Sequence, residues 1–148
     1  LSDPAFDELL NYWEARRRGR NIPARADIDP IHFPRLLPRV FMVRVDRAPL
    51  SFVYSLAGGE NVEAHGRNFT GMDVRELAGW WPGYGSSLHE FYSLVVHGGV
   101  PLAASGTMSF VDREFRAFEA LYLPLAAQDG DIGHIMGVAL YGSVEAVA

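Results

Sequence analysis

The dipeptide Asp129-Gly130 constrains the fold of this chain more than any other local feature, because long runs rich in apolar and β-branched residues lie on both sides of it. The two runs are residues 115–127 and 132–144. Asp-Gly readily adopts the backbone angles of a tight two-residue turn, so this pattern is a strong signal for a β-hairpin. A third run, residues 102–110, precedes them. We therefore predict three successive strands in the last third of the chain.

A second hairpin is predicted nearer the N-terminus, from residues 39–47 and 51–57. Between the two groups of strands, glycines cut residues 58–77 into short helical segments. A longer helix is predicted from about residue 85 to 97, with one apolar stripe made of Leu88, Phe91, Tyr92 and Val95. Two strands and three strands joined by a helical crossover predict an α+β fold, a five-stranded antiparallel sheet with these helices on one face.

The first 20 residues are predicted to form an amphipathic helix capped by Asp3. Its apolar residues recur at helical spacing, and such a stripe must pack against the chain's own sheet or against a second copy. The stripe consists of Phe6, Leu9, Leu10 and Trp13. Residues 21–38 contain four prolines and are predicted to be an ordered linker, which leaves residues 39–148 as the core of a single domain.

Composition excludes several classes of function. The chain has no cysteine, so disulfides and thiolate metal sites are excluded. The net charge is −5 and the main basic cluster, residues 16–20, suits a helix C-terminus, so we expect no nucleic-acid partner. No apolar run reaches 18 residues, so we expect no membrane partner and a cytoplasmic location. No two histidines have the spacing of metal ligands.

The order of elements resembles the PAS fold, as does Gly66 followed by the stretch Gly71–Leu77. Four pieces also resemble a divergent bacterial PAS family of mostly stand-alone regulators: residues 12–13 with the arginines after them, 23–30, 66–71 and 119–125. The resemblance implies a non-catalytic sensory or protein-interaction module in bacterial signalling, with a signalling protein as partner. It also implies a homodimer formed through the helix before the first strand, with Phe6, Leu9, Leu10 and Trp13 as the interface.

A ligand is expected in the space between the sheet and the crossover helices. The aromatic and aliphatic residues predicted there favour a small apolar or aromatic molecule, although the same stripe also suits a packed core. The predicted ligand-binding residues are Tyr54, Leu56, Phe69, Leu88, Phe91, Tyr92, Val95 and Glu119.

Other functions remain open from the residues alone, and the sequence assigns no cofactor. Among PAS domains, haem is held by a histidine of the crossover helix, which makes His89 the one candidate ligand here. Flavin chemistry that uses a cysteine is excluded, whereas a nonreactive flavin is not. Glu119 alternates with apolar residues, so a small acid–base enzyme built around a buried carboxylate is one alternative. A ligand-free dimerisation module with a solid core is the other.

Overall fold

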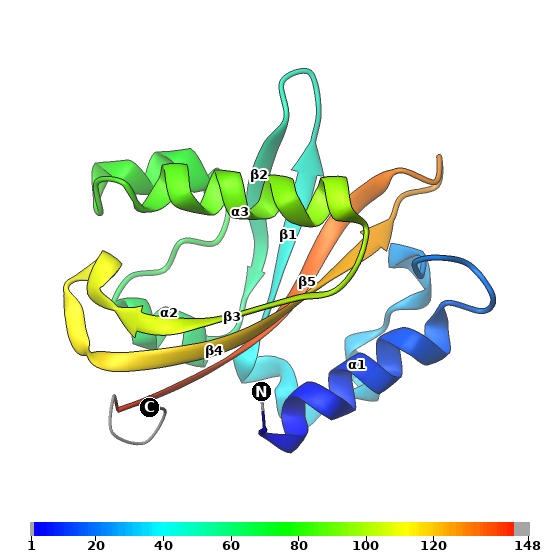
Figure 1. Cartoon of the computed structure of the whole chain (residues 1–148), viewed down its shortest axis with the longest axis horizontal. Coiled ribbons are helices and arrows are strands. Elements are labelled where there is room, and N and C mark those ends of the chain that lie inside the picture. Colours follow the sequence, from blue (N-terminus) through cyan, green and yellow to red (C-terminus); the bar gives the residue numbers. More distant parts are fainter. Residues whose placement is uncertain (1, 144–148) are drawn as a thin grey trace.

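The computed structural model describes residues 2–143, apart from the side chains of residues 110, 114 and 115. The predicted strand end at Val144 lies outside the described residues. The helices and strands follow in the predicted order (Figure 1). They are α1 (Pro4–Arg16), β1 (Val40–Asp46), β2 (Ser51–Ala57), α2 (Gly59–His65), the 3-10 helix η4 (Val74–Gly79), α3 (Tyr84–Gly98), β3 (Leu102–Met108), β4 (Arg113–Ala126) and β5 (Ile132–Ser143).

The five strands form one antiparallel sheet in the order β2-β1-β5-β4-β3, which confirms the predicted fold class. Both predicted hairpins are present. At the turn between β4 and β5, Gly130 has a φ of +90°, a conformation that glycine adopts without steric cost. The first and last strands meet in the middle of the sheet, where β1 pairs with β5.

Helices cover the two faces of the sheet separately (Figure 1). The crossover segments α2, η4 and α3 pack on one face, as predicted. The N-terminal helix α1 packs on the other face, against Leu121, Leu123 and Leu125 of β4. Each face therefore has its own apolar core.

The apolar stripe of α1 is buried within its own chain. Phe6, Leu9 and Trp13 are 3%, 0% and 2% exposed, and Leu10 is half-buried. Of the two alternatives that the sequence left open, the structure shows packing against the chain's own sheet. Phe6, Leu9 and Trp13 consequently offer no surface to a second copy, and Leu10 is the one residue of the predicted interface that is partly exposed.

The linker, described throughout residues 21–38, has no long helix and no strand, which agrees with its four prolines. It contains three short 3-10 helices, Arg25–Asp27, Pro30–His32 and Pro34–Arg39. Asp29 caps the second of them and its backbone N–H donates to the Tyr12 hydroxyl, which attaches the linker to α1. Within residues 2–143, no helix is both long enough and apolar enough to span a membrane.

Candidate ligand cavity

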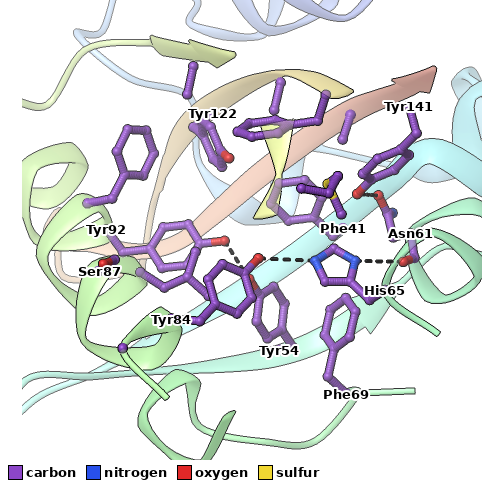
Figure 2. Close-up of a pocket in the computed structure, with 18 of the residues that line it drawn as sticks. Phe41, Tyr54, Asn61, His65, Phe69, Tyr84, Ser87, Tyr92, Tyr122 and Tyr141 are labelled. Atoms are coloured by element: carbon purple, nitrogen blue, oxygen red, sulfur yellow. Dashed lines mark hydrogen bonds between the residues drawn. The ribbon is translucent and has the colours of Figure 1, made fainter. Parts of the chain in front are cut away.

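A cavity of about 480 Å³ lies between the sheet and the helices α2 and α3 (Figure 2). Side chains from all five strands, from both helices and from the loops beside them line it, and most of these side chains are aromatic or aliphatic. The lining residues are Phe41, Tyr54, Asn61, His65, Phe69, Pro82, Gly83, Tyr84, Ser87, Leu88, Phe91, Tyr92, Ala104, Met108, Phe118, Ala120, Tyr122, Ala139 and Tyr141.

Five of the six tyrosines of the chain line this cavity. Tyr54 of β2 and Tyr92 of α3 share a hydrogen bond of 2.7 Å between their hydroxyl oxygens. One of the two hydroxyls donates to the other, so the pair keeps one O–H that is not used between them. Tyr122 of β4 stands beside them, with ring centroids 5.9 Å apart between Tyr92 and Tyr122.

A histidine joins the two helices at the other side of the cavity (Figure 2). His65 Nδ1 lies 2.8 Å from the backbone oxygen of Asn61, and His65 Nε2 lies 3.0 Å from the Tyr84 hydroxyl. A carbonyl oxygen can only accept, so Nδ1 carries the proton and donates to Asn61. In the neutral ring Nε2 is then the acceptor for the Tyr84 O–H. This tautomer connects the end of α2 to the start of α3.

Asn61 secures the same region to the sheet. Its side chain is 1% exposed, and its Nδ2 donates to the Val40 backbone oxygen at 3.0 Å. Its Oδ1 accepts a hydrogen bond of 2.7 Å from the Tyr141 hydroxyl of β5. The amide is thus satisfied on both ends by the protein, so Asn61 is a positioning residue of the cavity wall.

The cavity carries no formal charge. None of the described residues that line it is aspartate, glutamate, lysine or arginine. Burial raises the pKa of the Tyr54, Tyr92 and Tyr122 hydroxyls above their ordinary value, so they stay protonated. Burial also lowers the pKa of His65, which favours the neutral ring. The site can therefore offer hydrogen bonds and apolar contact, but no ion pair.

Five of the eight residues that the sequence predicted as ligand-binding line the cavity: Tyr54, Phe69, Leu88, Phe91 and Tyr92. Val95 of α3 does not line it. It is fully buried in the packed core on the same face of the sheet.

The prediction was wrong for Leu56, because strand alternation is interrupted. Met42 pairs with Leu56 whereas Val43 pairs with Tyr54, so Ser55 is an extra residue in a β-bulge. The bulge turns Leu56 to the opposite face, where it packs with the α1 core.

The prediction was also wrong for Glu119. Its neighbours Phe118 and Ala120 line the cavity, and successive side chains of a strand point to opposite faces. Glu119 therefore lies on the face that α1 covers, where it is half-buried. The carboxylate of the acid–base alternative is therefore not part of the cavity lining.

Several lining residues were not predicted from the sequence, notably Asn61, His65, Tyr84, Tyr122 and Tyr141. One sequence signal for Tyr122 was the alternation of Phe118, Ala120 and Tyr122 along β4. The residues between them, Ala117, Glu119 and Leu121, alternate with the same period. Both faces of this strand are largely apolar, so alternation alone could not identify the face with the cavity.

The histidine considered for haem lies outside the cavity. His89 Nε2 accepts a hydrogen bond of 2.9 Å from Arg75, and the ring packs edge-on against Phe52. The described residues contain no group of three or more histidine, cysteine, aspartate or glutamate side chains arranged to hold a metal ion.

Comparisons with known proteins agree with this architecture. A family model described as a PAS domain matches residues 1–140. The PAS domain of BvgS from Bordetella pertussis superposes with a TM-score of 0.57 at 18% identity, over 81% of this chain and 91% of that chain. A sensory box sensor histidine kinase from Vibrio cholerae superposes with a TM-score of 0.52 at 15% identity, over 77% of this chain and 92% of that chain. Curated protein sequences give no match. Because this family model matches nearly the whole chain, the protein belongs to the PAS domain family.

Proposed function

We propose that this chain is a non-catalytic sensory module that binds a small, uncharged apolar or aromatic molecule in the cavity between the sheet and α3. The observation that carries the proposal is a cavity of about 480 Å³ lined by aromatic side chains without a charged residue among the described ones. This volume lies within the range of small-molecule sites, which are mostly apolar with a few placed polar groups.

The same observation weighs against the two alternatives. An acid–base enzyme of the kind considered would need a carboxylate in the cavity, whereas Glu119 lies on the other face of the sheet. A pure dimerisation module would have a solid core, whereas this core contains a cavity of about 480 Å³. The cavity therefore favours ligand binding over both.

We further propose a role in bacterial cytoplasmic signalling, as a homodimer that acts on a signalling protein. Membership of the PAS family supports this proposal. So does the likeness to a PAS domain of BvgS and to a protein described as a sensor histidine kinase. The interface of such a homodimer would lie outside the buried residues of α1.

Native mass spectrometry of the protein purified from cells tests the binding proposal, because it shows a retained ligand and the oligomeric state together. Two neighbouring residues of β3 give a matched pair of variants. Ala104 lines the cavity, and Ala103 is exposed on the opposite face. Ala104→Phe should remove the extra mass, and Ala103→Phe should retain it.

The proposal fails if wild-type protein carries no additional mass and no aromatic compound of a fragment library raises its unfolding temperature. It also fails if both variants retain the extra mass, because the ligand would then sit elsewhere. A monomeric mass at micromolar concentration would contradict the homodimer alone.

A further inference from the structure

The hydroxyl of Tyr122 faces the cavity and has no hydrogen-bond partner among the described residues. The residue is only 8% exposed. Figure 2 shows it directed into the cavity, with no interaction drawn to it, whereas the hydroxyls of Tyr92, Tyr84 and Tyr141 are each connected to a neighbour. A hydroxyl that faces a cavity without a protein partner is open to a hydrogen bond from whatever occupies that cavity, water or a ligand atom. This hydroxyl therefore marks a place where a ligand atom would bind.

A second donor lies close by. The Tyr54–Tyr92 pair uses one hydroxyl hydrogen between its two oxygens and keeps the other. The Tyr122 ring contacts the Tyr92 ring, so both donors belong to one end of the cavity. Two O–H hydrogens at this end therefore have no acceptor among the described residues, and an acceptor oxygen on a ligand would supply one.

Aromatic rings flank Tyr122 and complete the site around the donors. The Phe91 ring lies edge-on to Tyr122 with a centroid distance of 4.5 Å, and the Phe41 ring does so at 5.6 Å. Such surfaces favour a flat apolar body through burial and ring contacts. An anion would find no Lys or Arg side chain among the described residues that line this cavity, so its desolvation would not be offset by an ion pair with them.

We propose that the ligand of this cavity is an uncharged molecule with an aromatic body and a carbonyl-type oxygen, and that this oxygen accepts a hydrogen bond from Tyr122. The inference rests on the proposed function, since it names the class of molecule for the same site. Tyr122 acts as the residue that selects an acceptor-bearing ligand over an otherwise similar hydrocarbon.

Three compounds of one shape test the inference: 2-acetylnaphthalene, 2-ethylnaphthalene and 2-naphthoate. They carry a neutral acceptor, no acceptor and a negative charge, respectively. Dissociation constants are measured by NMR titration of the full chain. The ketone should bind wild-type protein about tenfold more tightly than the hydrocarbon, which corresponds to one hydrogen bond from Tyr122. The carboxylate should bind more weakly than both.

Tyr122→Phe removes only the hydroxyl and should abolish the tenfold preference, with the affinity for 2-ethylnaphthalene unchanged. Tyr12→Phe is the matched control, because Tyr12 lies in α1 on the other side of the sheet. It should retain the preference. The unfolding temperature of ligand-free Tyr122→Phe should equal or exceed that of wild type, because the hydroxyl bonds to no described residue.

The outcomes separate this inference from the proposed function. Equal binding of ketone and hydrocarbon, or a preference that survives in Tyr122→Phe, overturns the role of Tyr122 and leaves ligand binding intact. Tightest binding of the carboxylate overturns the uncharged class. A Tyr122→Phe protein that unfolds or melts lower than wild type shows that the hydroxyl has a structural partner, and this also overturns the inference. Failure of all three compounds to bind folded wild-type protein counts against the proposed function itself.

Discussion

The indole Nε1 of Trp13 donates a hydrogen bond of 2.8 Å to the backbone oxygen of Pro124, across 111 residues of sequence. Pro124 lies in β4 just beyond the point where β3 begins, since Leu102 of β3 pairs with Tyr122. Because β3 does not extend alongside Pro124, no described strand on that side requires the backbone N–H that proline lacks. The helix α1 covers the carbonyl that the sheet leaves open, and two predictions concern the packing of this helix.

Trp13→Phe should lower the free energy of unfolding by about 2 kcal/mol, because it leaves the Pro124 carbonyl without its donor and reduces apolar contact. Urea denaturation measures the change. Trp80→Phe is the control, since Trp80 is half-buried in a loop and should lose less than about 1 kcal/mol. Equal losses in the two variants would show that the hydrogen bond contributes nothing to stability.

Leu9→Ala should destabilise the protein by about 2 to 5 kcal/mol, because Leu9 of α1 is fully buried in the core between this helix and the sheet. Leu94→Ala serves as the control, because Leu94 is 62% exposed on α3 and should change stability by less than about 0.5 kcal/mol. Denaturation and light scattering are measured on both variants. A Leu9→Ala protein of wild-type stability that has changed from dimer to monomer would instead place α1 between two copies.

Tyr92→Phe should cost about 1 kcal/mol of folding free energy, since it breaks the buried hydrogen bond with Tyr54. Ser86→Ala, a change on the exposed side of α3, should leave stability within about 0.5 kcal/mol of wild type. Both values follow from urea denaturation without ligand. A Tyr92→Phe variant as stable as wild type would mean that the hydroxyl pair makes no net contribution to folding.

Gly137→Ala should destabilise the protein by about 1 to 3 kcal/mol and weaken ligand binding. Gly137 of β5 pairs with Phe41 of β1, and an added methyl group would collide with the Phe41 ring, which lines the cavity. Displacing that ring changes the shape of the site. Gly79→Ala has open space around the new methyl group and should be neutral in both measurements. A Gly137→Ala protein that binds like wild type would show that the ring can move without loss.

Acidification should destabilise the protein as the pH falls below about 6.5, because burial lowers the pKa of His65 from that ordinary value. The unfolded chain then binds a proton that the folded ring does not, and each such histidine contributes a slope of up to about 1.4 kcal/mol per pH unit. The contribution of His65 to this slope ends once the pH falls below its lowered pKa in the folded protein.

The loss of folding stability on acidification should be smaller in His65→Gln than in wild type when urea unfolding is measured between pH 7.5 and 5. His97→Gln, at the exposed end of α3, is the control. Burial also lowers the pKa of His89 and His134, so a residual slope is expected in His65→Gln. Equal slopes in wild type and His65→Gln would contradict the buried neutral state of His65.

The elements of this fold could be predicted because their signals are local. The Asp129-Gly130 turn connects β4 and β5, and the stripe of α3 has the period of a helix. Five predicted residues line the cavity: Leu88, Phe91 and Tyr92 share one side of α3, Tyr54 lies in β2, and Phe69 lies in the loop between α2 and η4. Turn chemistry and periodicity act over a few residues, so a single sequence is enough to locate them.

Which side of each strand faces the cavity depended on contacts between residues far apart in the sequence. β4 is apolar on both sides, so only its packing between α3 and α1 decided that Tyr122 lines the cavity and Glu119 does not. One extra residue at Ser55 moved Leu56 to the far face. His65 and Tyr84 are 19 residues apart, and no local pattern brings them together. An apolar side chain can be buried against many partners at similar cost, so the sequence shows that it is buried, and the assembled sheet and helices select the partner.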